Sequence, residues 1–205
     1  RPLYGLALVG GKSQRMKKDK GSLDYFGKAQ GQHVYDLLNE VCEKTYISIR
    51  EEQSNLDYLN GMEGHCLPDK FLNMGPLGGL LTAFHKHPEA SWLVLACDLP
   101  YISKENLESL IKGRNYFKKA TCFKNPEKGW PEPLCTIYEP SSIKVFHQYL
   151  SLGVICPRKV LMNMPHELLD VSSDLTLQNV NTPEGYEEVK LKTKLKTFEN
   201  EGSYQ

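Results

Sequence analysis

Short apolar runs alternate along the chain with stretches in which apolar residues recur every three or four positions. Runs of strand length predict strands at residues 3–9, 45–49, 92–97, 120–123 and 134–138. The helical spacing predicts helices at residues 32–41, 77–84, 103–111 and 141–150, and a further helix beginning at Thr182-Pro183-Glu184. Strands that alternate with helices are typical of an α/β fold with a mostly parallel sheet.

The chain shows no Pro/Gly/Ser-rich linker and no internal repeat, so we expect residues 1–190 to form a single domain. Residues 191–205 are expected to form an extension and a solvated tail. Two interpretations stay open for residues 189–198. The alternation of Val189, Leu191, Thr193 and Leu195 fits an edge strand, and the spacing of Leu191, Leu195 and Phe198 fits a helix.

The composition excludes several broad classes of protein. The 205 residues are 40% hydrophobic and 24% charged, as in globular chains, with 25 basic and 25 acidic side chains. A neutral chain gives no reason to expect nucleic acid as a partner, and no apolar run is long enough to cross a membrane. The opening RPLYGLALVGG lacks the features of a secretory signal, and we expect a cytoplasmic protein.

Six cysteines are spread along the chain with no CxxC pair. A chain of this length and apolar content does not need disulfide bonds to fold, so we expect free thiols in a reducing compartment. No pair has the spacing of zinc ligands.

The first candidate for chemistry is the loop that follows the first predicted strand, in LVGGKSQRMKKDKG. Gly10 and Gly11 carry no side chains, so their N–H groups can approach phosphate oxygens. Five basic residues follow them: Lys12, Arg15, Lys17, Lys18 and Lys20. Amide donors beside Lys and Arg suit a polyphosphate. The loop has neither the P-loop nor the GxGxxG pattern, so a solvated basic loop stays an alternative.

Polar residues at the ends of other predicted strands are the second candidate. Asp98 follows the apolar run 92–97, at the sheet edge where α/β proteins bind ligands. A carboxylate beside a phosphate-binding loop is what a magnesium–nucleotide site requires. Asp69 also falls where a strand meets a helix, and Asn179 and Asn181 alternate about a strand end and can reach the same edge. Capping and turn roles stay open for these residues.

These residues resemble a known family. LVGGKSQRMKKDK is similar to the LxGGxSxRMGxDK signature of the molybdenum cofactor guanylyltransferases and of their wider nucleotidyltransferase superfamily. Four further motifs follow in the family's order and spacing: GPLGG at 75–79, CDLPYI at 97–102, EPL at 132–134 and NVNTPE at 179–184. The LxGG opening resembles the guanylyl branch, since the cytidylyl branch typically opens LxAG. The resemblance implies a Rossmann-like three-layer α/β/α nucleotidyltransferase fold with a mostly parallel central sheet.

The resemblance also implies roles for single residues on the nucleotide side. Leu8 and Gly10 contact the guanine nucleotide through their backbone, and Gly11 lies in the same nucleotide-binding loop. Arg15 and Lys20 hold the phosphates as catalytic residues.

Further family positions surround that loop. Ser48 and Asp69 fall near the base and the ribose, although some relatives have Asn where this chain has Ser48. Asp98 falls at the position of a catalytic metal ligand, for Mg²⁺ with Mn²⁺ as an alternative. Asn179 and Asn181 match an Asn pair of the family that lies close to the metal or the acceptor, and Arg158 and Lys159 resemble a basic pair on the side that binds the pterin acceptor.

The activity implied is transfer of GMP from GTP to the terminal phosphate of molybdopterin or the molybdenum cofactor, with release of pyrophosphate. GTP and molybdopterin are then the substrates, cofactor-insertion or molybdenum-loading proteins are partners, and the protein is a monomer that binds neither nucleic acid nor a membrane. One alternative keeps the fold and changes the substrates: a cytidylyltransferase for the same cofactor, or a transferase acting on sugar phosphates. An alternative of another class is a nucleotide- or cofactor-binding carrier without turnover.

Overall fold

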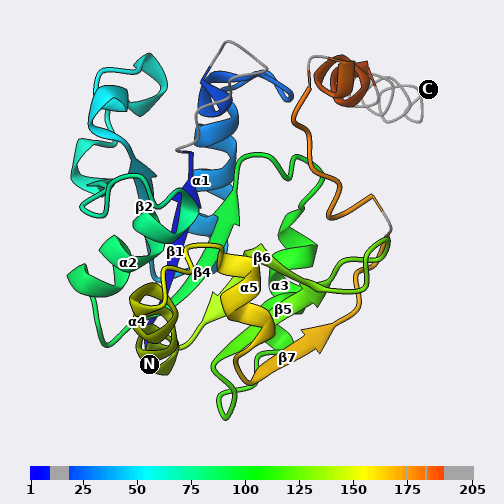
Figure 1. Ribbon diagram of the computed structural model, residues 1–205. Coiled ribbons are helices and arrows are strands. Elements are labelled where there is room, and N and C mark those ends of the chain that lie inside the picture. Colours follow the sequence, from blue (N-terminus) through cyan, green and yellow to red (C-terminus); the bar gives the residue numbers. More distant parts are fainter. Residues whose placement is uncertain (10–18, 174, 183, 192–205) are drawn as a thin grey trace.

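The computed structural model describes residues 1–9, 19–173, 175–182 and 184–191. Within these residues, strands form one seven-stranded sheet in the order β3-β2-β1-β4-β6-β5-β7 (Figure 1). The strands are β1 Leu3–Leu8, β2 Lys44–Ile49, β3 Cys66–Pro68, β4 Ser91–Ala96, β5 Ala120–Lys124, β6 Pro131–Tyr138 and β7 His166–Leu169. The α-helices are α1 Gln30–Val41, α2 Pro76–Lys86, α3 Lys104–Lys112, α4 Ile143–Ser151 and α5 Pro157–Met162, and residues 184–191 are also helical.

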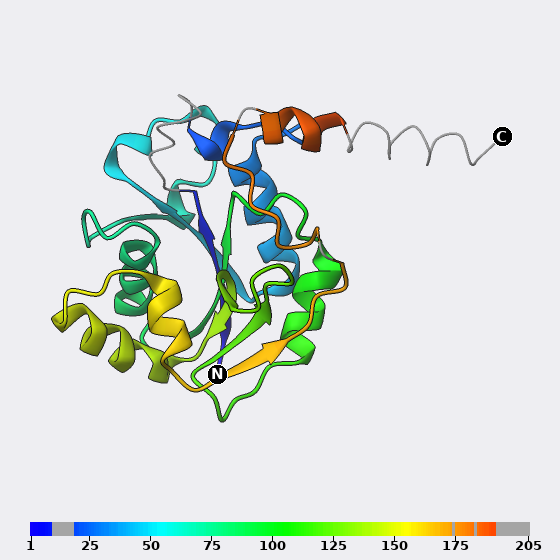
Figure 2. The ribbon, with the colours of Figure 1, turned by 45° about the vertical axis from the view of Figure 1, so that its right-hand side comes forward.

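Helices cover both faces of the sheet, so the protein has three layers (Figure 2). α2, α4 and α5 pack on one face, where Trp92 of β4 belongs to their core cluster. α1 and α3 pack on the other face, against Leu93 and Leu95 of the same strand. Because β4 buries both of its faces, its sequence SWLVLA is apolar almost throughout instead of alternating with polar residues.

The order of the strands places a switch point between β1 and β4. β1 pairs in parallel with β2 on one side and with β4 on the other, and β2 pairs in parallel with β3. The chain therefore builds β2 and β3 outward from β1, then crosses back to add β4 on the opposite side. In such sheets a crevice opens beyond the carboxyl ends of the two diverging strands, and ligands bind there.

β6 reverses direction and brings its first residues to that same edge. It pairs antiparallel with β4, with Leu95 opposite Cys135 and Trp92 opposite Tyr138. β4 ends at Ala96, and the same register continued three residues past Leu95–Cys135 would set Glu132 opposite Asp98. At the other end of this pair, the first residues of β4 lie beside the last residues of β6.

The predicted α/β class, three layers and mostly parallel sheet are confirmed. The sequence analysis missed β3, β7 and α5, which are too short to show a period: their sequences are CLP, HELL and PRKVLM. α1 begins at Gln30, two residues before the predicted start. Residues 189–191 are helical, so the edge-strand interpretation is wrong for them, and residues 192–198 lie outside the described part.

All six cysteines belong to the described residues and all are free thiols, as expected. Burial raises the pKa of Cys42 to about 12, and it raises the pKa of Cys97 and of Cys135 further. Over the described part of the chain, none of the helices combines the length and the apolar character that a membrane crossing requires.

Candidate active site

Three polar side chains from distant parts of the sequence meet at the switch point. Lys20 opens a 3-10 turn, η1 (Lys20–Ser22), after the β1 loop, and Asp98 follows β4. The Lys20 Nζ lies 3.5 Å from Asp98 Oδ2 and donates a hydrogen bond to Asn181 Oδ1. The side chains of Lys20 and Asp98 are 18% and 19% exposed, so solvent still reaches the pair. The structure thus brings together three of the residues that the sequence singled out.

The segment that carries Asn181 is fixed to the end of β4 by its backbone. The Val180 N–H donates to the Asp98 carbonyl at 2.9 Å. Val180 is buried in a small cluster with Leu23 and Tyr25, while Asn179 is exposed. The two Asn side chains therefore lie on either side of a buried Val, although residues 178–181 do not form the strand that the sequence analysis expected.

The Asp98 carboxylate retains an unused oxygen. Its Oδ1 is buried and has no hydrogen-bond partner, although leaving a buried acceptor unpaired typically costs about 1–3 kcal/mol. Carboxylate and amide oxygens are the ligands that a hard divalent cation prefers. The Asp98 Oδ1 therefore fits a divalent cation, whereas Asn181 Oδ1 already accepts the Lys20 ammonium.

A second polar pair lies at the ends of β2 and β3. Ser48 Oγ donates to Asp69 Oδ1 at 2.7 Å, and the Asp69 N–H donates to the Ile49 carbonyl at 2.8 Å. Burial raises the pKa of Asp69, and the Ser48 hydrogen bond and the Arg50 charge act against that rise. Gly79 of the GPLGG motif lets α2 approach this pair, because a Cβ there would lie 2.2 Å from Ser48 Oγ.

Glu132 is an acidic neighbour that the sequence analysis quoted within EPL without assigning it a role. It is 4% exposed, and its Oε1 accepts from the Leu134 N–H at 3.0 Å. Burial raises its pKa most, Asp98 raises it further, and Arg158 and Lys128 lower it. A buried carboxyl facing both a second carboxylate and two cations is a common feature of functional sites.

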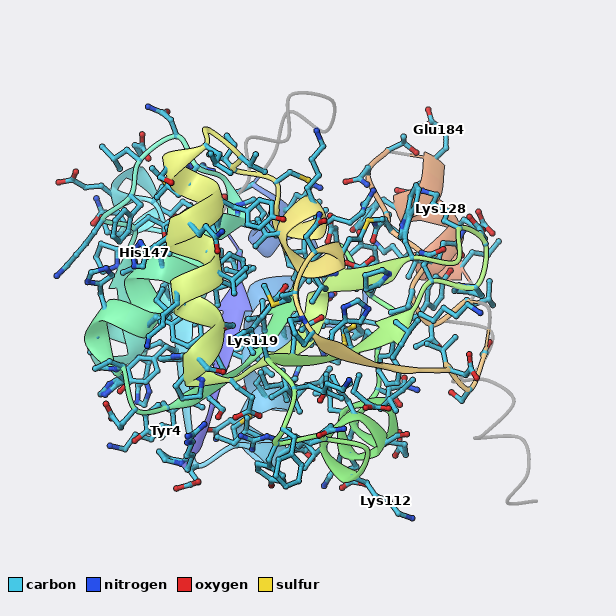
Figure 3. All side chains as sticks on the ribbon, turned by 60° about the horizontal axis from the view of Figure 1, so that its bottom comes forward. Tyr4, Lys112, Lys119, Lys128, His147 and Glu184 are labelled. Atoms are coloured by element: carbon cyan, nitrogen blue, oxygen red, sulfur yellow. The ribbon has the colours of Figure 1, made fainter. Side chains whose placement is uncertain are left out.

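Arg158 belongs to the same part of the site through Trp130. Its guanidinium lies 4.7 Å from the centre of the Trp130 ring, and Lys128 Nζ lies 5.5 Å from that centre. Lys128, labelled in Figure 3, comes from the connection between β5 and β6. The Arg158 Nε is buried without a hydrogen-bond partner. Lys159, the next residue of α5, is exposed, whereas Arg158 is half-buried.

A cavity of about 370 Å³ adjoins the Asn pair. Its walls include Tyr101, Asn179 and Asn181, together with Glu184 and Glu188 of the last helix. Asn179 and Asn181 therefore border a space large enough to take part of a ligand.

Of the residues expected at the start of the loop, the structure describes Leu8. Leu8 ends β1, and its carbonyl already accepts the Cys97 N–H at 3.2 Å. Gly10, Gly11 and Arg15 lie outside the described residues. Gln53 and Tyr58, which contact Asp19 beside Lys20, were not expected, because neither belongs to a motif or a periodic stripe.

A lysine, a carboxylate and an amide that meet at the switch point of a three-layer α/β sheet are typical of nucleotidyltransferases. The sequence profile of the MobA-like NTP transferase domain matches residues 5–167. The chain belongs to this family and is a nucleotidyltransferase.

Named relatives agree with this classification. The chain is 38% identical over 92% of its length to a molybdenum cofactor biosynthesis bifunctional protein of Synechocystis, and it spans 54% of that protein. It is 30% identical over 85% of its length to a "probable molybdenum cofactor guanylyltransferase" of Flavobacterium johnsoniae, and it covers 90% of that protein. The chain therefore spans about half of the first relative and most of the second.

A solved structure shares the fold. Molybdopterin-guanine dinucleotide biosynthesis protein A of Archaeoglobus fulgidus aligns with a TM-score of 0.75 at 21% identity, over 92% of this chain and 97% of that one.

Proposed function

We propose that this protein transfers GMP from GTP to the terminal phosphate of molybdopterin or of the molybdenum cofactor and releases pyrophosphate. The observation that carries the proposal is the group of Lys20, Asp98 and Asn181 at the switch point between β1 and β4. The relatives named for this reaction support the choice of substrates.

The chemistry requires positioning and charge neutralisation more than proton transfer. An oxygen of the acceptor phosphate attacks the α-phosphorus of GTP, and a new phosphorus–oxygen bond forms. The bond between the α-phosphorus and the bridging oxygen breaks, and its electron pair leaves with pyrophosphate. The acceptor phosphate is already an anion at neutral pH, so the step needs no general base.

Lys20 is proposed to stabilise the negative charge that develops on the departing pyrophosphate. Arg15 and the amides of Gly10 and Gly11 are proposed to act with it. The Lys20 ammonium is held by Asp98 and Asn181, so its position is set before substrate arrives. A fixed, partly buried cation stabilises a transition state better than a mobile one, because no reorganisation is needed during the reaction.

Asp98 is proposed to hold Mg²⁺, or Mn²⁺ in its place. When bound, such a cation neutralises phosphate charge and orients the triphosphate. The unpartnered Asp98 Oδ1 supports this assignment.

The two polar regions on either side are proposed to bind the two substrates. Ser48 and Asp69 would accept hydrogen bonds from the nucleoside, with the Leu8 backbone beside them. Arg158, Lys159, Asn179 and Asn181 would bind the acceptor. The buried Arg158 Nε without a partner supports an anionic ligand on this side.

A substrate panel tests the proposal. Purified protein with Mg²⁺ is incubated with molybdopterin and each of GTP, CTP, ATP and UTP, and pyrophosphate release is measured together with the dinucleotide product. Sugar phosphates replace molybdopterin in a parallel series. We expect product with GTP and molybdopterin alone.

Other outcomes would contradict the proposal in distinct ways. A preference for CTP would make the protein a cytidylyltransferase. Turnover with a sugar phosphate would change the acceptor. GTP binding in isothermal titration without product would indicate a carrier.

A further inference from the structure

The connection between β2 and β3 carries a buried glutamine that the site chemistry has not used. A 3-10 turn, η2 (Glu51–Gln53), directly follows β2. Gln53 is 2% exposed, although its turn neighbours Glu51 and Glu52 are exposed. A buried primary amide is retained where both its oxygen and its nitrogen find partners.

The Gln53 side chain bonds to two backbone groups and to one carboxylate. Its Nε2 donates to the Val9 carbonyl at 3.3 Å and to Asp19 Oδ2 at 2.5 Å. Its Oε1 accepts the Arg50 N–H at 2.8 Å. Val9 directly follows β1, and Asp19 immediately precedes Lys20. One side chain therefore ties together the two ends of the sequence that carries Gly10, Gly11 and Arg15.

Asp19 is held on its other oxygen as well. Its Oδ1 accepts the Gly21 N–H at 2.9 Å, which caps the turn that begins at Lys20, and the Tyr58 hydroxyl at 3.3 Å. Burial and the Asp19 charge raise the pKa of Tyr58, so this hydroxyl keeps its proton and stays a donor. Gly21 and Gly31 make room for the Tyr58 side chain, since a Cβ at Gly21 would lie 2.3 Å from its hydroxyl oxygen and a Cβ at Gly31 would lie 2.6 Å from its ring.

We propose that Gln53 is a positioning residue that sets the location of Lys20 by fixing Asp19 to the end of β1. Only a primary amide of this length makes all three hydrogen bonds, because it donates two and accepts one. A carboxylate would repel Asp19, and an apolar side chain would leave the Asp19 and Val9 oxygens without these donors. Tyr58 is a weaker support to the same carboxylate. The inference rests on the proposed function, because its readout is guanylyl transfer.

The inference predicts a loss in kcat more than in binding. Lys20 acts on charge that develops in the transition state, so a displaced ammonium lowers kcat while GTP still binds. We expect Gln53→Ala to lower kcat about 10- to 100-fold, as for the loss of a hydrogen bond to a charged group, with KM for GTP within about threefold. Tyr58→Phe should lower kcat by about threefold to tenfold.

The variant Gln53→Glu should show a pH dependence of kcat that a purely structural role of Gln53 would not produce. Its carboxylate would lie against Asp19, with Tyr58, Cys97 and Lys20 as the other titratable groups nearby. Like charges raise the pKa of one member of such a pair, and the protonated carboxyl can then donate as the amide did. We expect its kcat relative to wild type to rise at least about threefold from pH 8 to pH 6.

The experiment measures steady-state kinetics, GTP binding by titration calorimetry and thermal melting for these variants, with Ser54→Ala as the control from the same turn. Ser54 is exposed, and its hydroxyl bonds only within the turn, to the Glu51 carbonyl. A Gln53→Ala protein with wild-type kcat would overturn the inference. So would equal losses in Gln53→Ala and Gln53→Glu at every pH with a matching fall in melting temperature. If the wild type does not turn over, the proposed function fails instead.

Discussion

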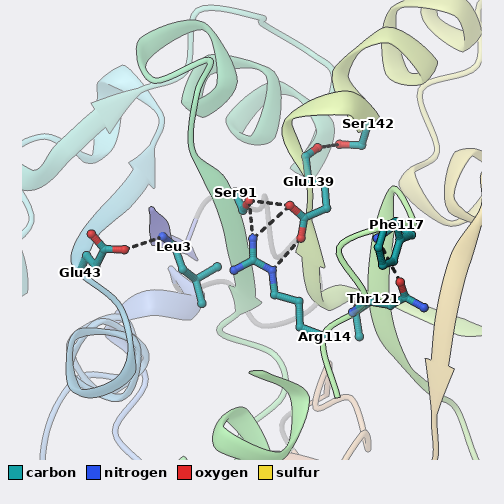
Figure 4. Close-up of polar contacts among 9 residues, drawn as sticks. Leu3, Glu43, Ser91, Arg114, Phe117, Thr121, Glu139 and Ser142 are labelled. Carbon is teal, nitrogen blue, oxygen red and sulfur yellow. Dashed lines mark hydrogen bonds and ion pairs between the residues drawn. The ribbon is translucent and has the colours of Figure 1, made fainter. Parts of the chain in front are cut away.

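The amino edge and the carboxyl edge of the sheet, where β4 begins and ends, each hold a cation next to a carboxylate. The two ion pairs differ in how many of their carboxylate oxygens have a hydrogen-bond partner. At the amino edge, Arg114 binds both oxygens of Glu139, at 2.7 and 3.0 Å, with side chains only 4% and 1% exposed (Figure 4). Ser91 Oγ accepts from Arg114 at 2.6 Å and donates to Glu139 at 2.8 Å. Both carboxylate oxygens of this group are therefore paired.

At the carboxyl edge, Lys20 and Asp98 are farther apart, more exposed, and one Asp98 oxygen has no partner. A fully bonded ion pair leaves nothing for a ligand to bind, and it acts to hold β4 and β6 together. An incompletely bonded one keeps binding capacity at a cost in stability. The comparison separates a structural charge group from one that is available for substrate.

The largest expected effect concerns the amino edge. Arg114→Ala leaves the Glu139 charge buried without its partner, which should lower the free energy of unfolding by about 3–5 kcal/mol. Denaturant titration measures this. Turnover at a temperature where the variant is folded should stay near wild type, because the substitution lies at the opposite edge from Asp98. Lys112→Ala is the control, because Lys112 is exposed and ends α3 two residues before Arg114 (Figure 3).

The second effect concerns the carboxyl edge. Asp98→Ala and Lys20→Ala should each lower kcat by about 100- to 1000-fold, while the melting temperature stays close to that of the wild type. Lys28→Ala breaks an exposed ion pair with Asp36 and serves as the control. Near-normal turnover in either site variant would remove that residue from the proposed catalytic group.

Replacing a Glu by Gln should change the stability of the protein in opposite directions at the two edges. The pKa of Glu132 is raised in the folded protein, so folding favours its protonated form. In the unfolded chain the pKa of a Glu is about 4.3. The stability that the protonated form contributes is therefore lost as the pH rises from that value through the higher pKa of the folded protein. Glu132→Gln should therefore stabilise the protein at neutral pH, on the order of 1 kcal/mol, with no gain below about pH 4.

Glu139→Gln is the matched variant for that experiment. It removes the charge that balances Arg114, so it should destabilise at neutral pH. Melting curves from pH 4 to pH 8 measure both. If Glu132→Gln also destabilises at pH 7, the Glu132 carboxylate is held by favourable contacts and the contrast between the edges fails.

The smallest effects concern two serines. Ser91→Ala removes hydrogen bonds to Arg114 and Glu139 and should lower stability by about 1 kcal/mol with KM for GTP unchanged. Ser48→Ala removes the donor to Asp69 and should raise KM for GTP about five- to tenfold. A change in KM from Ser91→Ala would blur the division between the two edges.

Periodicity predicted the elements whose burial is regular. The stripe Leu77, Leu80, Leu81 and Phe84 is buried on α2, and the run 92–97 gives the central strand β4. β3 and β7 could not be predicted in this way, because three or four residues give no period. The antiparallel direction of β6 is set by the connection from β5, which no local pattern records.

Site residues could be predicted from the sequence when only one type of residue can supply the chemistry. Lys20 and Asp98 could be singled out because a polyphosphate site needs a cation and a carboxylate at strand ends. Gln53 could not, since its role depends on contacts to Val9 and Asp19, which lie 44 and 34 positions from it in sequence. Glu132 becomes visible only when the reversed β6 sets it opposite Asp98.

The bond between Lys20 and Asn181 joins residues 161 positions apart, and this has a consequence for truncated chains. The last strand of the described sheet ends at Leu169, so a chain cut between Leu169 and Asn181 retains every described strand. Such a chain would hold Lys20 and Asp98 without the amide that accepts the Lys20 ammonium. The sheet and the complete proposed catalytic group therefore depend on different stretches of the chain.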